Sequence, residues 1–160
     1  MKISVLGLVL MMLIGGALVQ AQEYRPETGT FIKDMQRNGL GVLTIVNSDN
    51  RMDAFAELTG LNKEPLIKVF IRAGESFTIS GIEDGQYDMY FKLGNRWDQS
   101  NLKFLANETL YKLDKSLQFQ TEETPQGRSY SAWTVALEGS VPNGNEPMQP
   151  NPVSQEEFPS

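Results

Sequence analysis

The chain has 160 residues, with 14 lysines and arginines against 20 aspartates and glutamates, so its formal net charge is −6. This acidic balance disfavours nucleic acid and anionic lipid as partners, because phosphate binding depends on Lys and Arg contacts. The chain has no histidine and no cysteine, which excludes a Ser-His-Asp arrangement, thiol chemistry, and the imidazole and thiolate ligands of zinc, copper and non-haem iron.

The first 21 residues predict a cleaved secretory signal. Lys2 precedes an uncharged run from Ile3 to Val19, and small residues at Val19 and Ala21 fit a signal peptidase site after Ala21. An uncleaved membrane anchor would need about 20 apolar residues, more than this run provides. Cleavage leaves a net charge of 13 − 20 = −7. We therefore expect an exported protein, periplasmic or extracellular, with no membrane span after signal cleavage.

The segment 22–38 is polar and predicts an extended lead-in whose Thr-Phe-Ile sequence adds a short strand. From 39 to 138, apolar and polar residues alternate with period two, which is typical of strands that pack one face inward. Strands are expected at 40–47, 52–60, 66–72, 76–80, 85–93, 111–121 and 128–138. The first two predict a hairpin across a short Ser/Asp/Asn turn. The stretch 94–110 predicts a longer connection with a strand fragment near Phe104.

The strand pattern defines the expected fold class. No segment has the spacing of an amphipathic helix, and frequent turns favour antiparallel ladders over a parallel sheet, which would need helical crossovers. We predict an all-β fold, an antiparallel β-sandwich of about seven to eight strands, immunoglobulin-like or transthyretin-like. The Pro-rich C-terminal tail, 139–160, is expected to be mobile or to lie along the domain surface. Its Val153–Phe158 end places a hydrophobe on each side of an acidic pair and could dock into a groove.

Four residues are candidates for ligand binding: Tyr90, Trp97, Asp98 and Tyr130. The alternation leaves both tyrosines opposite the inward-facing side chains of their strands, while Trp97 falls in a predicted loop beside Asp98. Aromatic rings next to carboxylates and amides suit sugar or peptide recognition. The alternative, favoured by the average burial of large aromatics, is that Trp97 plugs the end of the sandwich and Asp98 caps a turn.

Two acidic loops are weak calcium candidates. The loop 47–53 offers Asp49 and Asp53, and the loop 83–88 offers Asp84. Neither fits the twelve-residue helix-loop-helix pattern, because the bidentate glutamate at its twelfth position is missing. Asp and Asn are common in turns because their side chains hydrogen-bond the nearby backbone. We therefore favour a structural role for these loops and expect no metal and no cofactor.

An ordered set of motifs supports a family resemblance: GLGVLTIVN, DAFAEL, IRAGESFTISGIEDGQYDMYFKLGNRWD, AWTVAL and the closing GNEPMQPNPVSQEEF. In this set the chain resembles, over residues 39–158, a family of exported bacterial domains of unknown function. The resemblance implies an all-β fold and export, and it carries over no catalytic residues. The IEDGQY segment is also similar to the turn before a core tyrosine in transthyretin-like and carboxypeptidase-regulatory β-sandwich modules, which assist or bind. Gly85 and Tyr87 match that turn, while Asp84 stands where proline is frequent.

These features lead us to expect an exported, non-catalytic accessory or binding module for a glycan, a cell-wall fragment or a protein. Two alternatives stay open. One is a small hydrolase with paired carboxylates, which would need a concave, partly apolar pocket. The other is a structural envelope protein that docks on a partner through its C-terminal tail.

Overall fold

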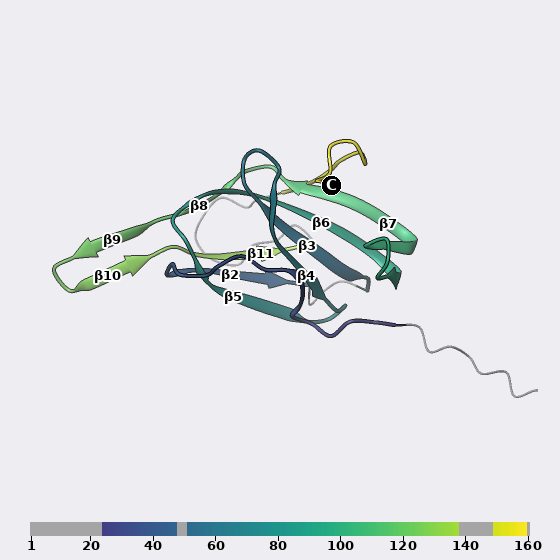
Figure 1. Ribbon diagram of the computed structural model, residues 1–160, viewed down its shortest axis with the longest axis horizontal. Coiled ribbons are helices and arrows are strands. Elements are labelled where there is room, and N and C mark those ends of the chain that lie inside the picture. The colour runs from purple at the N-terminus through teal and green to yellow at the C-terminus, as the bar shows by residue number, and fades with distance from the viewer. Residues whose placement is uncertain (1–23, 48–50, 138–148, 160) are drawn as a thin grey trace, which may run out of the picture.

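A computed structural model describes residues 24–47, 51–137 and 149–159 (Figure 1). The predicted signal segment, 1–21, and the candidate Asp49 lie outside them. The described residues form twelve strands and no helix, which confirms the predicted all-β, sandwich-like fold. Within these residues, no helix is long and apolar enough to cross a membrane.

The larger sheet, sheet 1, is antiparallel throughout and has the spatial order β1-β4-β3-β6-β7-β12. A seventh strand, β8, pairs with the first residues of β6. The bounds are β1 Thr30–Lys33, β3 Asp53–Thr59, β4 Pro65–Ile71, β6 Gly85–Asp98, β7 Lys103–Leu113, β8 Leu117–Phe119 and β12 Pro150–Pro152.

The smaller sheet, sheet 2, has the order β11-β2-β5, with β2 at Gly41–Val46, β5 at Ser76–Ile82 and β11 at Ala132–Ala136. Its β11 and β2 run parallel, which the antiparallel prediction did not include. The chain reaches β11 through a separate hairpin, β9 Thr121–Thr124 and β10 Gly127–Tyr130. This hairpin projects well beyond the two sheets (Figure 1).

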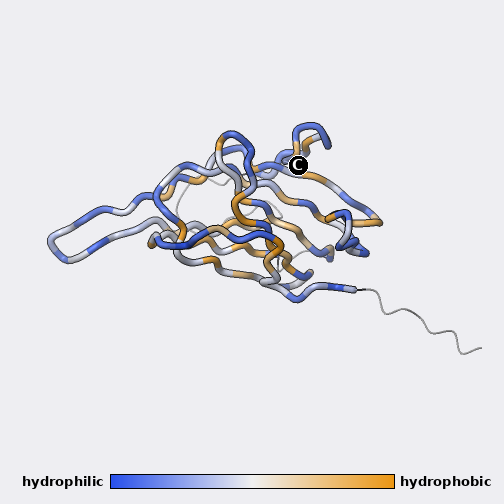
Figure 2. Tube along the Cα trace, viewed as in Figure 1, coloured by the Kyte–Doolittle hydropathy of each residue, from blue (hydrophilic) through white to orange (hydrophobic). Residues whose placement is uncertain are grey.

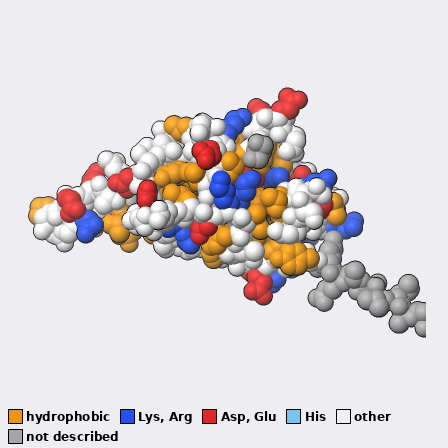
Figure 3. Space-filling view, viewed as in Figure 1, with side chains coloured by type: hydrophobic (Ala, Val, Ile, Leu, Met, Phe, Trp, Pro, Cys, Tyr) orange, Lys and Arg blue, Asp and Glu red, His pale blue; other side chains and the backbone are white. Residues whose placement is uncertain are grey.

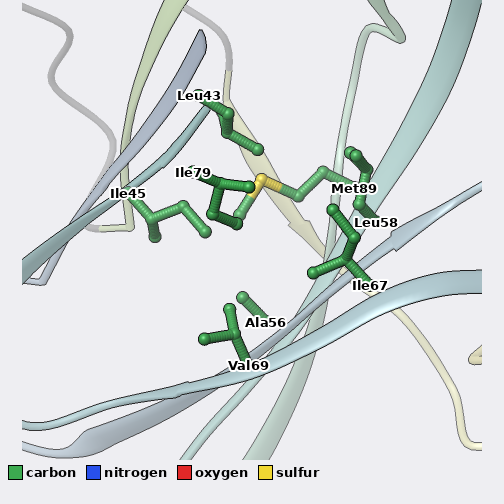
Figure 4. Close-up of a pocket in the computed structure, with 8 residues that line it drawn as sticks. All are labelled: Leu43, Ile45, Ala56, Leu58, Ile67, Val69, Ile79 and Met89. Atoms are coloured by element: carbon green, nitrogen blue, oxygen red, sulfur yellow. The ribbon is translucent and has the colours of Figure 1, made fainter. Parts of the chain in front are cut away.

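The main core lies between the sheets and takes hydrophobic residues from both. Figure 2 shows hydrophobic positions along the strands of the two sheets. The period-two prediction identifies this set well, since Ile67, Val69, Met89 and Phe91 are at most 1 % exposed. Eight core side chains from β2, β3, β4, β5 and β6 point toward one another: Leu43, Ile45, Ala56, Leu58, Ile67, Val69, Ile79 and Met89 (Figure 4). They leave no space large enough for a water molecule, so this interior is packing and not a ligand site.

Two predicted connections are wrong. The strands predicted at 40–47 and 52–60 do not form a hairpin: β2 belongs to sheet 2 and β3 to sheet 1. Asn47, 1 % exposed, anchors this crossing because its side-chain amide donates to the carbonyls of Met52 and Arg72, at 3.0 and 3.2 Å. Neither the composition nor the length of a turn reveals whether the chain stays in one sheet.

The stretch 94–110 is not a connection either, because β6 and β7 continue through it as a long hairpin. Gly94 permits this course, since a side chain there would collide with Phe104. Conversely, the strand predicted at 111–121 breaks into β7, β8 and the start of β9. The structure thus has more strands than the seven to eight predicted, and their lengths vary from 3 residues in β8 to 14 residues in β6.

Candidate functional site

The outer face of sheet 1, the face turned away from sheet 2, carries two of the four predicted binding residues. Tyr90 points to this face, opposite Met89 and Phe91, as the alternation predicts. The expectation that Tyr90 is exposed is wrong, because only 1 % of it is accessible. Phe158 from the C-terminal tail covers it, with the two ring centroids 5.6 Å apart in an edge-to-face arrangement.

Trp97 is also buried, at 5 % exposure. Its ring packs against Phe55, Phe70 and Phe104, at centroid distances of 4.8, 5.4 and 5.0 Å. This aromatic cluster lies on the outer face and is separate from the main core. Trp97 is therefore a packing residue, as the alternative interpretation expected, but it covers sheet 1 and does not plug the sandwich end.

Asp98 caps a turn, which confirms the second part of that alternative. Its carboxylate accepts hydrogen bonds from the backbone N–H groups of Ser100 and Asn101, at 3.0 and 3.3 Å, and from the Asn101 side chain at 2.7 Å. The side-chain hydrogen bond from Asn101 lowers the pKa of Asp98. The remaining candidate, Tyr130, is 52 % exposed on β10 of the projecting hairpin. The four predicted residues do not form one exposed surface.

The described calcium candidates hold the fold together. Asp53, 7 % exposed, accepts hydrogen bonds from Nε and Nη2 of Arg25, at 2.8 and 2.5 Å, and from the Ala73 N–H at 2.8 Å. Asp84 accepts the N–H and the hydroxyl of Thr121, at 2.9 and 2.8 Å. Asp84 thereby fixes the base of the projecting hairpin. Among the described residues, no group of three or more carboxylates is arranged to hold a metal ion.

The outer face contains charged side chains in an unusually buried setting. One row of cross-strand neighbours runs Lys68, Glu57, Tyr90, Lys112 over β4, β3, β6 and β7. Glu57 is 1 % exposed, and one of its carboxylate oxygens lies 3.2 Å from Lys68 Nζ. In the next row Lys92 is 8 % exposed and donates a hydrogen bond to the Leu102 carbonyl at 2.9 Å.

This burial shifts the titration of the outer-face groups. Burial raises the pKa of Glu57, although Lys68 and Lys92 oppose the shift. Burial likewise lowers the pKa of Lys92, against the attraction of Glu108 and Glu57. At Asp88, burial acts to raise the pKa, but hydrogen bonds from Lys112 and Ser116 outweigh it and the pKa is lowered. The face is thus a desolvated charged layer and not a wet surface.

The cover over this layer is the segment Gln149–Pro159, which we call the C-terminal clasp. Its β12 pairs with the end of β7, with Asn151 opposite Lys112. Backbone hydrogen bonds join Asp114 N–H to the Gln149 carbonyl and Val153 N–H to the Leu110 carbonyl, both at 3.0 Å. Proline suits this position because β12 is an edge strand that needs few N–H donors.

A turn after β12 directs Phe158 onto the outer face. The Glu157 carboxylate accepts from the N–H and hydroxyl of Ser154, at 2.9 and 3.1 Å, and Lys63 Nζ donates to the Glu157 carbonyl at 3.0 Å. Phe158 is consequently 4 % exposed. Its ring lies between Tyr90 and Lys92, with Lys92 Nζ 4.9 Å from the ring centroid.

The outer face with its clasp is therefore the candidate site. The sequence predicts that Tyr90 lies on this face and that the Val153–Phe158 end could dock into a groove. It does not predict that Phe158 docks on Tyr90. The hydrophobic residue next to two acids was the sequence feature that indicated docking of the tail. The side chains that receive it, Glu57 and Lys92, lie at strand positions that the alternation predicts to face solvent. Comparison of the chain with protein-family models, with curated proteins and with solved structures found no match.

Proposed function

We propose that the protein is an exported, non-catalytic module that binds an extended segment of a partner protein on the outer face of sheet 1. The observation that carries this proposal is the clasp itself. Gln149–Pro159 adds a strand to β7 and inserts one aromatic side chain beside Tyr90. Strand addition with a side-chain pocket is an established way of recognising a peptide.

A protein segment fits this site better than a glycan does. Sugar recognition needs an accessible aromatic ring, but Tyr90 and Trp97 are both nearly inaccessible. When the clasp leaves, the β7 backbone next to Leu110 and Lys112 loses its partners. An unpaired strand edge of this kind favours pairing with another extended chain.

A carboxylate-based hydrolase receives less support. The three buried carboxylates among the described residues are each engaged by a cation: Asp53 by Arg25, Glu57 by Lys68 and Asp88 by Lys112. Glycoside hydrolysis needs one carboxyl group that can donate a proton beside a second one. The structural envelope alternative would need the clasp to dock on a partner, whereas here it docks on its own chain.

The binding proposal is tested with a displayed library of random peptides. The library is panned against the full chain carrying Phe158→Ala, which opens the aromatic position, and in parallel against the wild-type chain. We expect peptides that are enriched on Phe158→Ala and lost when Tyr90→Ala is added. If no peptide is enriched on the Phe158→Ala chain, the proposal is contradicted.

Export is tested separately, by determining the N-terminal residue of the mature protein from its native cell envelope. Cleavage after Ala21 predicts a mature chain that begins at Gln22. A chain that retains residues 1–21 contradicts this part of the proposal.

A further inference from the structure

We propose that the partner segment carries the pattern Ser-x-x-Glu-Phe after an extended stretch, and that the C-terminal clasp is its intramolecular competitor. This inference rests on the proposed function and specifies the ligand of the same site. The pattern is that of Ser154–Phe158, in which each fixed residue has a distinct contact.

The aromatic position is selective because of what surrounds it. The Lys92 ammonium lies over the face of the Phe158 ring, at 4.9 Å, while Tyr90 meets the ring edge-to-face. A cation is attracted to the face of an aromatic ring, more strongly when both groups are desolvated. An aliphatic side chain of similar size fills the same space without this attraction, so the site distinguishes phenylalanine from leucine.

The serine and glutamate positions are selective for a different reason. The Glu157 carboxylate holds the N–H and hydroxyl of Ser154, and Phe158 N–H bonds the Ser154 carbonyl at 3.2 Å. These bonds form within the segment, so none of them depends on the receiving face. A pre-formed turn reduces the ordering cost of binding.

The charge balance of the site also suits an acidic segment. Four lysines, Lys63, Lys68, Lys92 and Lys112, and four carboxylates, Glu57, Asp88, Glu108 and Asp114, lie on or beside the face that the clasp covers, a balance of 4 − 4 = 0. The whole chain has a net charge of −6. The clasp thus brings two glutamates, Glu156 and Glu157, to a group of side chains whose charge balance is less negative than that of the whole chain.

The clasp is held by contacts that water can replace. Its pairing with β7 spans Pro150–Pro152 with one further backbone hydrogen bond at each end. The buried ammonium of Lys92 lies against its ring, and the buried carboxylate of Glu57 belongs to the residue opposite Tyr90 in β3. Opening the clasp returns water to the Lys92 ammonium, and this recovers part of the desolvation cost. The clasp therefore opens more easily than a purely apolar cover, although its tether gives it an effective concentration on the order of millimolar.

The test uses a labelled synthetic peptide with the sequence of residues 149–159, titrated into full-length chains while fluorescence anisotropy is followed. Two variants open the clasp without changing the receiving face: Phe158→Ala removes the ring, and Val153→Pro removes the N–H that bonds Leu110. We expect both to bind the peptide about tenfold or more tightly than the wild type, in which the clasp competes.

Matched peptides test the pattern. On an opened chain, Phe158→Leu in the peptide is expected to weaken binding about tenfold, and Ser154→Ala or Glu157→Ala about three- to tenfold through the lost turn. Adding Lys92→Met to the opened chain should abolish the difference between the phenylalanine and leucine peptides, while leaving some binding of each.

Two results overturn the inference. One is that the opened chains, folded by circular dichroism, bind the phenylalanine and leucine peptides equally; the other is that they bind neither. If random-peptide panning nevertheless enriches segments of another pattern, the proposed function stands and only this inference fails. If panning also enriches nothing, both are wrong.

Discussion

The two faces of sheet 1 are both buried at the middle of β6, but they are differently built. Met89 and Tyr90 are neighbours in β6, point to opposite faces, and are each 1 % exposed. Met89 is covered by sheet 2, in a continuous apolar core. Tyr90 is covered by the C-terminal clasp, beside the charged groups Glu57 and Lys92. Two equally buried side chains can therefore differ in how easily the segment that covers them is removed.

The difference lies in what each face gains when its cover is removed. Separating the two sheets exposes apolar surface, which costs about 25 cal/mol per Å². Removing the clasp exposes Phe158 and Tyr90 but rehydrates the Lys92 ammonium, which lies against the Phe158 ring. We conclude that the core face defines the fold, while the outer face is the part of the molecule suited to exchanging one cover for another.

The largest effect is expected from breaking the core face. Phe91 is fully buried and stacks on Tyr111, with ring centroids 5.2 Å apart. Phe91→Ala removes this ring and leaves a cavity that sheet 2 cannot fill, so the free energy of unfolding should fall by about 3–5 kcal/mol. Urea denaturation followed by tryptophan fluorescence measures it. A loss below about 1.5 kcal/mol, the range of tolerated core swaps, would contradict the packing described here.

The next effect is expected from the charged layer. Glu57→Ala leaves Lys68 without its buried carboxylate partner and removes one of the two carboxylates that attract Lys92, the other being Glu108. The free energy of unfolding should fall by about 3 kcal/mol, because an uncompensated buried charge is costly. The same urea experiment measures the loss.

The control is Glu123→Ala on the projecting hairpin. Glu123 lies 3.5 Å from Arg128, but its side chain is 81 % exposed, and Figure 3 shows charged side chains open to solvent along this hairpin. Its loss should change stability by no more than about 0.5 kcal/mol. If both substitutions have equal effects, Glu57 is not part of a buried layer.

The same contrast explains what could be predicted from the sequence. Alternation identifies the inward residues of β3, β4 and β6, because a core face needs only a repeating apolar side chain. Alternation also marks Glu57, Tyr90 and Lys92 as outward, which is correct. It cannot show that they are covered, because their cover lies 60 or more positions away, in a tail whose prolines suggest no regular structure.

The connections were less predictable than the strands. Asn47 stands in a sequence that looks like a simple turn, and its role in leading the chain from sheet 2 to sheet 1 depends on carbonyls contributed by other segments. The β6–β7 hairpin continues through polar residues because Gly94 lets Phe104 cross it closely. Both features are tertiary contacts without a local periodic signal.

Phe158→Ala compares the two faces directly, because it removes a phenylalanine ring from the outer face, whereas Phe91→Ala removes one from the core face. Phe158 is 4 % exposed, yet its loss should lower the free energy of unfolding by only about 1–2 kcal/mol, since the site can refill with water. Hydrogen exchange should speed up at the Val153 amide, which bonds Leu110, and not at core amides of β3. A loss as large as that of Phe91→Ala would make the clasp a fixed part of the fold.

The smallest effect is a difference in pH dependence within the charged layer. The folded pKa of Asp88 is lowered, so this carboxylate contributes stability above its ordinary pKa, and the contribution is lost as the pH falls below about 4. The folded pKa of Glu57 is raised, so its burial penalty is present at neutral pH and is relieved as the pH falls toward about 4.5.

Stability curves from pH 7 to 3 for the wild type, Asp88→Asn and Glu57→Gln test these signs. As the pH falls, Asp88→Asn should lose less stability than the wild type, because it lacks the carboxylate whose protonation is unfavourable in the fold. Glu57→Gln should lose more, because it lacks the carboxylate whose protonation is favourable, and each difference should stay below about 1 kcal/mol. Deviations of the same sign would mean that the two acids share one environment. Opposite signs would mean that Lys112 and Ser116 hold Asp88 ionised, while Glu57 lies in a buried setting beside Tyr90 that favours its neutral form.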